Sequence, residues 1–379
     1  MRKIAIISGN GGSGGLIGYI KGILSADVVP ENTIIKFYCR KNLVEKIGAV
    51  VKNVEICITN DLNEKGKEIV FGKRLSNRFI KMVDNFCPDV VFFVNGYIRK
   101  GLEEYPNVMV LHNQLYIDKK QFWREGLTIN LLKRLLFRRC VINNMHKADG
   151  VLFLSNFSMN QTLEYGHKIK NAKVIPFGFE DENRIDKVLL KPVGNPIKFI
   201  YISAIYPYKN HKEIVKGLSK LKEDGLEIEL HFVGSSDKKT LKKLYNTIKD
   251  RNMEQNVVFH NWVDHDKIKN YIDNMDIFVY ASSIETTGYG LLEGMARGAC
   301  IISSNQSGFD EILDAGGVYF DPENIDSIYQ AAKKIISDEQ LRKECANKAF
   351  INSAHYSWEK AASNLYKFLL SFIKDKENY

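Results

Sequence analysis

Two carboxylates, Glu285 and Glu293, flank a glycine-containing turn in residues 282–304, SSIETTGYGLLEGMARGACIISS. Residues 288–290 are expected to begin a helix, and Gly298 is expected to end it. The free N–H groups and the dipole at the start of such a helix attract anions, a diphosphate among them. A carboxylate on either side can hold the vicinal hydroxyls of a sugar or a ribose. The pattern favours a sugar–diphosphate–nucleoside ligand; the plainer alternative is that Glu293 solvates its helix and Glu285 is a loop charge.

A second candidate anion site is the glycine loop SGNGGSGG, residues 8–15, which follows a strand pattern and precedes a helix pattern. Gly9, Gly11 and Gly14 have the G-x-G-x-x-G spacing of dinucleotide-binding loops. That fingerprint expects an acid at the end of the next strand, and here the strand runs into Arg40. An arginine can meet a 2′-phosphate, so an NADP oxidoreductase stays open as an alternative. The loop itself predicts that backbone N–H groups closely approach an anion.

These motifs need strand ends and helix starts to position them, and strand and helix patterns alternate along the whole chain. The strands are continuous apolar runs, as expected when helices cover both faces of a parallel sheet. The predicted strands are KIAIIS, TIIKFYC, VEICIT, PDVVFFVNG, VMVLHNQ, GVLFLS and NAKVIPFGF in the first half, and KFIYISA, IELHFVG, NVVFHNW, DIFVYAS, ACIIS and GVYFD in the second.

The composition turns polar near residues 180–196, where two of the chain's eight prolines lie, and this indicates a linker. We therefore predict an α/β fold of two tandem, doubly wound, Rossmann-like domains that face one another across a cleft. Ligands are expected at the carboxyl ends of the strands. The predicted domains are residues 1–178, residues 179–355, and a helical segment over residues 356–379.

The formal net charge of +9 indicates an anionic partner, such as nucleic acid, an anionic membrane or a phosphorylated ligand. Zinc-finger spacing, an RNP-like motif and a basic zipper are all absent from the sequence, so nucleic acid is not an expected partner. The six cysteines include no C-x-x-C pair, which is typical of buried thiols in a reducing compartment. The opening MRKIAIIS has a strand pattern rather than that of a signal peptide, and no apolar run is long enough to span a membrane. We expect a cytoplasmic protein.

The order of these motifs resembles the retaining glycosyltransferases of family 4, which have the GT-B fold. ETTGYGLLEGMARG is similar to the E-x7-E element of that family, with Glu285 and Glu293 at its spacing. The resemblance continues, in the family's order, through ADGVLFLSNFS, AKVIPFGF, YISAIYPYKNHKEIV, NVVFHNWVDHDKIKNYI, SGFDEIL, GGVYFDPEN and the closing HYSWEKAASNLYKFL. It implies that the first domain binds the acceptor, the second binds the donor, and the last helix crosses back to the first domain.

The resemblance further implies a metal-independent, retaining hexosyltransferase that uses a UDP- or GDP-sugar as donor and needs no cofactor. The implied acceptor is a glycan or a lipid-linked glycan of bacterial polysaccharide or lipopolysaccharide biosynthesis. Three alternatives stay open: an epimerase or phosphorylase of the same fold, an NADP-dependent oxidoreductase, and a catalytically inactive binding subunit.

The resemblance assigns catalytic roles to His112, Lys209 and Glu285. Glu285 is expected to meet the sugar hydroxyls, Glu293 the ribose, and Lys209 the diphosphate of the leaving group. His112 ends a strand of the first domain near the reacting sugar; the alternative is a hydrogen-bonded structural histidine. The donor-binding residues are expected to be Gly14, Gly15, Ser203, Lys209, Gly234, Trp262, Glu285, Thr286, Thr287, Gly288, Tyr289, Gly290, Leu291 and Glu293.

The sequence departs from the family's pattern at several positions. Ala204 stands where the family often has an arginine that binds the diphosphate. Either the donor-site lysine carries more of this charge, or Lys212 or Arg99 substitutes, and both alternatives stay open. Thr287 replaces a frequent aromatic residue, and Phe177 replaces a common asparagine. These departures bear on the identity of the donor sugar rather than on the class of enzyme.

Residues 264–266 form a literal D-x-D, which is the metal motif of a different glycosyltransferase fold. Here the motif lies just before a predicted helix. We therefore expect Asp264 to cap that helix and no essential metal to bind.

Basic residues gather beside leucines in residues 119–139. An amphipathic basic helix can lie on an anionic leaflet, and family members with lipid-linked acceptors work at the inner membrane surface. The alternative is a core helix with a solvated basic face. We predict peripheral contact with an anionic membrane that salt weakens. The bases are Lys119, Lys120, Arg124, Lys133, Arg134, Arg138 and Arg139, and the leucines are Leu131, Leu132, Leu135 and Leu136.

Overall fold

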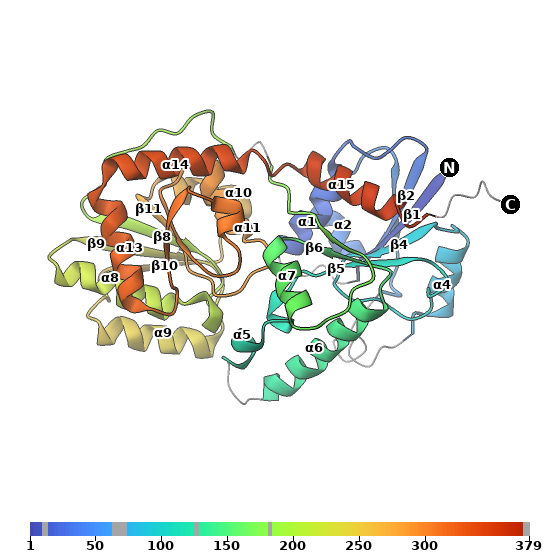
Figure 1. The fold of residues 1–379 in the computed structure, drawn as a ribbon, viewed down its shortest axis with the longest axis horizontal. Coiled ribbons are helices and arrows are strands. Elements are labelled where there is room, and N and C mark those ends of the chain that lie inside the picture. The colour runs from blue at the N-terminus through green and yellow to red at the C-terminus, as the bar shows by residue number, and fades with distance from the viewer. Residues whose placement is uncertain (10–13, 63–73, 125–128, 181–183, 374–379) are drawn as a thin grey trace. The chain divides into compact units, whose positions relative to one another are not determined.

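The structure is a computed structural model that describes residues 1–9, 14–62, 74–124, 129–180 and 184–373 (Figure 1). The chain divides into two compact units. The first contains Met1–Phe179 with Tyr356–Tyr379, and the second contains Glu180–His355. Each unit contains one sheet with helices packed against it.

The first unit has a seven-stranded sheet in the order β3-β2-β1-β4-β5-β6-β7. Every ladder in it is parallel. All residues of its central strands β4, β5 and β6 are buried, which explains their continuous apolar sequences. The strands are β1 (Arg2–Ile7), β2 (Thr33–Cys39), β3 (Val54–Ile58), β4 (Val90–Phe93), β5 (Asn107–Val110), β6 (Gly150–Phe153) and β7 (Ala172–Val174).

The helices of the first unit include one from the far end of the chain. Helix α15 contacts α1 and β4. Its Trp358 ring occupies space that a Cβ atom at Gly22 or Gly178 would fill, and its Tyr366 hydroxyl donates to the carbonyl of Ile23. The α-helices described are α1 (Gly14–Ser25), α2 (Lys41–Ile47), α4 (Asn77–Asp84), α5 (Lys119–Trp123), α6 (Ile129–Lys147), α7 (Asn156–Glu164) and α15 (Trp358–Leu370).

The second unit has a six-stranded, wholly parallel sheet in the order β10-β9-β8-β11-β12-β13. Its strands are β8 (Ile197–Ile202), β9 (Ile228–Val233), β10 (Val257–Asn261), β11 (Ile277–Tyr280), β12 (Ile301–Ser304) and β13 (Gly317–Phe320). Its helices are η3 (Pro207–Lys209), α8 (His211–Glu223), α9 (Lys238–Asp250), α10 (His265–Asp273), α11 (Tyr289–Ala296), α12 (Asp310–Leu313), α13 (Ile325–Ser337) and α14 (Glu339–Ser353).

The strand order reverses at one point in each sheet, between β1 and β4 in the first and between β8 and β11 in the second. The predicted α/β fold with two doubly wound parallel sheets is therefore confirmed. In such sheets the loops at the carboxyl ends of the two strands that flank the reversal diverge and leave a crevice for a ligand. In the second unit these are the loops that follow β8 and β11, which carry Lys209 and Glu285.

Candidate active site

Helix α11 begins at Tyr289, directly after Gly288, as the sequence predicted. Gly288 has a φ of 78°, and a Cβ atom there would lie 3.0 Å from the Phe309 ring, so the position requires glycine. The helix ends as expected too: Gly298 has a φ of 64°, and its N–H donates to the carbonyl of Met295 at 3.0 Å. The N-terminus of α11 therefore lies in the loop region beyond the carboxyl end of β11.

Lys209 and Glu285 form an ion pair between the ends of the two loops. Their side chains are 12% and 23% exposed, so the pair is largely shielded from water. Burial lowers the pKa of Lys209 to about 7, and the Glu285 carboxylate opposes this shift because it favours the charged ammonium. The two residues that the resemblance assigned to the diphosphate and the sugar thus lie together, and Glu285 is three residues before Gly288, which precedes α11.

Hydrogen bonds fix the two loops relative to each other. The side-chain amide of Asn210 donates to the carbonyl of Ala281 at 2.6 Å and to the hydroxyl of Ser283 at 2.8 Å. The N–H of Ser283 donates to the carbonyl of Tyr208 at 2.8 Å. The N–H of Glu285 donates to the hydroxyl of Ser307 at 3.1 Å. Lys209 and Glu285 are therefore held on a rigid support, which favours preorganised electrostatic catalysis.

Glu293 lies in α11 and is 8% exposed. Its Oε1 atom is 2.8 Å from Nε2 of His265, the first residue of α10. The imidazole is also tilted against the Tyr289 ring at 5.9 Å, and the Tyr289 hydroxyl donates to the carboxylate of Glu180. Burial, with Glu180 nearby, raises the pKa of Tyr289. The sequence did not predict His265 as a site residue.

Other predicted donor-site residues lie in the loops at the same edge of the sheet. Thr286 and Thr287 are 8% and 3% exposed, and Thr287 Oγ1 is buried without a hydrogen-bond partner among the described residues. Gly234 has a φ of 150°, and a Cβ atom there would overlap the carbonyl of Ser203. Trp262 follows β10 and is 70% exposed. An unsatisfied hydroxyl and an exposed indole are features that a bound ligand would complete.

Leu291 contributes differently from its neighbours in α11. Its side chain is fully buried, and its N–H donates to the carbonyl of Gly288 at 2.8 Å. Gly290, by contrast, has no side chain, and a Cβ atom there would touch the Tyr280 ring at 3.4 Å. At Gly290, the first turn of α11 therefore presents backbone rather than a side chain.

In the first unit, His112 follows β5 and packs edge-on against Tyr19 at 5.0 Å and Phe177 at 6.2 Å. Burial lowers the pKa of His112 to about 4, although a hydrogen bond with the Val94 backbone partly raises it. The imidazole is therefore neutral near pH 7. This hydrogen-bonded setting is also what a structural histidine requires.

The glycine loop of the first unit is described at its two ends. The N–H of Gly9 donates to Oδ1 of Asn95 at 3.0 Å. Gly14 begins α1, and a Cβ atom at Gly15 would meet nothing within 4 Å. Gly11 lies outside the described residues. Open space beside the Gly15 backbone is compatible with the close approach of a ligand.

The two bases considered as substitutes for an arginine at Ala204 have other surroundings. Lys212 Nζ lies 4.0 Å from the carboxylate of Glu213 on α8. Arg99 is 6% exposed in the first unit. In the second unit, Lys209 is the base that the structure pairs with Glu285.

The leucines of α6 do not all face inward. Leu131 is 6% exposed, whereas Leu132, Leu135 and Leu136 are 64%, 37% and 37% exposed. Lys133 and Arg139 are exposed on the same helix. We call these five exposed residues, Leu132, Lys133, Leu135, Leu136 and Arg139, the basic leucine face. Three of the four leucines are therefore exposed, and Leu131 is the one that packs inward.

Two of the predicted surface bases instead hold α6 to α5. The guanidinium groups of Arg134 and Arg138 lie 4.7 and 5.3 Å from the Phe122 ring. They donate to the carbonyls of Phe122 and Ile117 at 2.7 and 3.1 Å.

None of the helices described is long and apolar enough to cross a membrane.

The D-x-D segment does not cap α10 as predicted. Asp264 occupies the N-cap position, but its side chain makes no capping hydrogen bond; Oδ2 lies 3.3 Å from Lys267 Nζ instead. Across the part of the chain that the structure describes, no three or more metal-ligating side chains are grouped to hold an ion.

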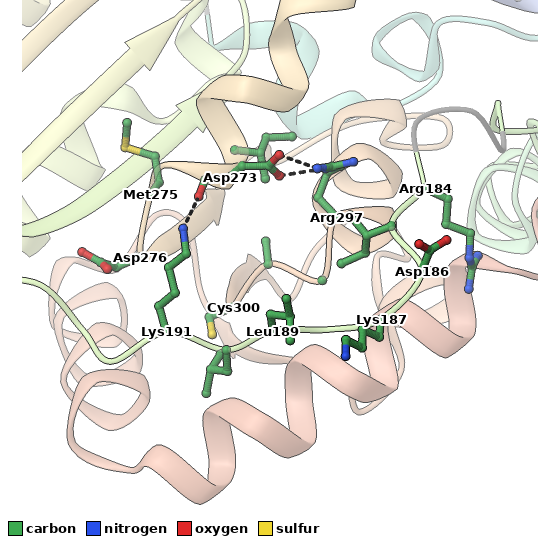
Figure 2. A pocket seen from close by; sticks show the side chains of 15 residues that line it. Arg184, Asp186, Lys187, Leu189, Lys191, Asp273, Met275, Asp276, Arg297 and Cys300 are labelled. Carbon is green, nitrogen blue, oxygen red and sulfur yellow. Dashed lines mark hydrogen bonds and ion pairs between the residues drawn. The ribbon is translucent and has the colours of Figure 1, made fainter.

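A cavity of about 520 Å³ lies at the other edge of the second sheet (Figure 2). It is lined by Asp276 and Cys300, which directly precede β11 and β12, and by the segment 184–191. Arg297 and Asp273 form a two-bonded ion pair in its wall. None of the predicted site residues is among those that line it. The donor site proposed from the sequence is therefore a separate region, at the carboxyl edge.

The two doubly wound sheets have the GT-B architecture of glycosyltransferases. The chain aligns over 98% of its length with the whole of Anabaena HepE, solved in complex with UDP and glucose, with a TM-score of 0.71 and 16% sequence identity. Residues 181–351 match the family model described as "Glycosyl transferases group 1". This match covers most of the second unit, which carries the Lys209–Glu285 pair.

Curated relatives extend this similarity. Protein CapJ of Staphylococcus aureus is 27% identical over 184 residues, which are 48% of this chain and 46% of CapJ. This chain thus matches about half the length of that relative. The N-acetylgalactosamine-N,N'-diacetylbacillosaminyl-diphospho-undecaprenol 4-alpha-N-acetylgalactosaminyltransferase of Campylobacter jejuni is 26% identical over 90% of this chain and 83% of its own length. The second unit thus resembles group 1 glycosyltransferases in sequence, and the chain resembles HepE in fold.

Proposed function

We propose that this protein is a retaining, metal-independent glycosyltransferase that transfers a sugar from a UDP- or GDP-sugar to a glycan or lipid-linked acceptor of a bacterial surface polysaccharide. The observation that carries the proposal is the shielded Lys209–Glu285 pair beside the N-terminus of α11. The Campylobacter relative, named for a diphospho-undecaprenol acceptor, and HepE, solved with UDP and glucose, support the same chemistry.

The proposed donor places its diphosphate at the N-terminus of α11. The helix dipole and the Lys209 ammonium stabilise the negative charge that develops on the leaving nucleoside diphosphate. Glu285 accepts hydrogen bonds from the sugar hydroxyls and pairs with the Lys209 ammonium. The buried Thr287 hydroxyl, which has no partner among the described residues, supplies a further donor for a phosphate or sugar oxygen.

Further residues of each unit have proposed roles. Glu293 holds the ribose, and the loops with Gly234 and Trp262 line the base. On the first unit, the neutral His112 exchanges hydrogen bonds with the reacting sugar, and the backbone at Gly14 and Gly15 approaches the donor.

The proposal is tested with the purified full chain, a panel of UDP- and GDP-sugars, and a lipid-linked acceptor, in the presence of EDTA. We expect release of the nucleoside diphosphate only when the acceptor is present, and a product that retains the anomeric configuration of the donor. Conversion of the donor without acceptor would indicate an epimerase, and oxidation or reduction of a nicotinamide would indicate an oxidoreductase. Loss of turnover on EDTA treatment would contradict the metal-independent mechanism.

We further propose that the basic leucine face contacts an anionic bilayer at the cytoplasmic face of the inner membrane, where a lipid-linked acceptor lies. Leu132, Leu135 and Leu136 supply apolar area, and Lys133 and Arg139 supply charge that complements anionic headgroups. We expect the protein to bind phosphatidylcholine vesicles that contain phosphatidylglycerol, and added salt to weaken this binding. The double variant Leu132→Glu/Leu135→Glu is expected to bind at least about tenfold more weakly in vesicle sedimentation.

Leu163→Glu is the matched control, because Leu163 is an exposed leucine on α7, 43% exposed, outside the basic leucine face. This variant should bind like the wild type. Equal binding to vesicles of phosphatidylcholine alone would rule out the proposed contact.

A further inference from the structure

The contact between His265 and Glu293 gives the D-x-D segment a role that neither metal binding nor helix capping explains. Nε2 of His265 lies 2.8 Å from Oε1 of Glu293. At this separation, Nε2 can donate a hydrogen to the carboxylate, which only accepts. The Glu293 side chain is 11% exposed and the His265 side chain is 55% exposed, so a solvent-facing imidazole holds a shielded carboxylate in place.

The second oxygen of Glu293 points to a different place. Its Oε2 atom would lie 3.7 Å from a Cβ atom at Gly290, the second residue of α11. The two oxygens of the carboxylate therefore face different groups. Oε1 contacts His265, and Oε2 lies near the backbone of Gly290 in the first helical turn. This turn is where the proposed diphosphate and ribose meet.

The groups that surround His265 define a small polar cluster. The imidazole is tilted against the Tyr289 ring at 5.9 Å, and Tyr289 donates to Glu180. The other two members of the motif face elsewhere: Asp264 lies 3.3 Å from Lys267 Nζ, and Asp266 is the acid in the first turn of α10. His265 is thus the member of the motif that reaches the proposed site.

We propose that His265 is a positioning residue that fixes the rotamer of Glu293, so that Oε2 is presented to a ribose hydroxyl of the nucleotide donor. The inference rests on the proposed function, because it needs a ribonucleoside diphosphate at α11. Without the donated hydrogen bond, Glu293 loses the partner that satisfies Oε1 inside the protein, and the carboxylate is free to rotate. The ribose then loses part of its recognition, while the sugar end of the donor is unaffected.

The test is isothermal calorimetry with UDP and GDP and with their 2′-deoxy and 3′-deoxy analogues. We expect His265→Ala to weaken binding of the preferred ribonucleotide about tenfold, the size expected from losing one hydrogen bond to a charged group. The loss of affinity from a ribonucleotide to its deoxy analogue should be about tenfold smaller in His265→Ala than in the wild type. His265→Gln places an N–H donor at a similar reach and should restore most of the affinity. In turnover assays, KM for the donor should rise about tenfold in His265→Ala, with kcat within about twofold of the wild type.

Lys267→Ala is the matched control, because Lys267 is on the same helix with a 61% exposed side chain. Lys267→Ala should bind the nucleotides and turn over the donor like the wild type. Melting curves show whether each variant folds. Equal weakening of the ribo- and deoxyribonucleotides in His265→Ala would mean a merely structural role and would overturn the inference, as would unchanged binding. Failure of the wild type to bind either nucleotide would overturn the proposed function together with this inference. Wild-type binding that Glu293→Gln weakens but His265→Ala does not would overturn this inference alone.

Discussion

Glu285→Gln is expected to slow sugar transfer by about a thousandfold, at the upper end of what removal of one preorganised polar group costs an active site. The amide keeps the shape of the side chain but loses the charge that holds Lys209 in an ion pair. It also accepts weaker hydrogen bonds from the donor sugar than a carboxylate does. The measurement is kcat with saturating nucleotide sugar and acceptor, together with the affinity for the free nucleoside diphosphate.

Because Glu285 is assigned to the sugar, binding of free UDP or GDP should change much less than turnover. Glu254→Gln provides the control, since Glu254 is an exposed carboxylate that follows α9. It should retain full activity. Wild-type turnover in Glu285→Gln would remove this residue from the mechanism and leave the protein without its main proposed catalytic group.

Lys209→Ala should lower kcat/KM for the donor by two to three orders of magnitude, on the order of 3–4 kcal/mol of transition-state stabilisation. Unlike the glutamate variant, it should also weaken UDP or GDP binding strongly, because the ammonium is proposed to contact the diphosphate itself. Ala204 supplies no second charge in this loop, so Lys209 has no backup there. Calorimetry and initial rates on the same preparation check both effects.

The pKa of Lys209 provides an independent check. Burial lowers it to about 7, so the lysine of the donor-free protein loses its proton as the pH rises above this value. Affinity for UDP or GDP should therefore fall between about pH 7 and pH 9, a range in which the nucleotide's own charge is already nearly constant. Lys209→Arg, whose guanidinium stays protonated, should bind with little pH dependence over the same range. Parallel pH profiles for the two proteins would contradict the assignment.

Much of the fold could be predicted from local patterns. The run VVFF became β4, Val90–Phe93, because a strand buried on both faces of a parallel sheet needs an uninterrupted apolar run. The start of α11 and its terminal glycine were predicted because the left-handed backbone at Gly288 and Gly298 is one that glycine adopts at little cost. The patterns for β8 and β11 placed Lys209 and Glu285 at strand ends, and the rules of doubly wound sheets then brought them to the same edge.

Helices α7 and α2 are among those that were not predicted. Helix α7 has a mixed polar sequence, NFSMNQTLE, without a clear apolar stripe; its signal was Ser155, whose hydroxyl caps it by accepting from the Ser158 N–H. Helix α2 has no side-chain cap at Arg40 and is seven residues long, so neither capping nor periodicity marks it.

The contacts inside the site could not be predicted from spacing. The contact between His265 and Glu293 joins the start of α10 to the middle of α11, and its length depends on how the two helices pack. The Asp264 cap failed for the same reason, because the side chain found a lysine one turn along instead of the backbone N–H groups. Sequence patterns identify residues at an edge of a sheet, while the choice among competing polar partners is made by packing.

The way α15 completes the first unit has a consequence for biosynthesis. When the ribosome has just finished Phe179, all seven strands of the first sheet have been made, yet the tryptophan and tyrosine that will cover Gly22, Gly178 and Ile23 are still untranslated. The nascent N-terminal half must therefore remain partly uncovered while the entire second unit emerges. The first unit is therefore completed only after the second unit has been made, and a stop codon before Trp358 would remove the side chains that cover it.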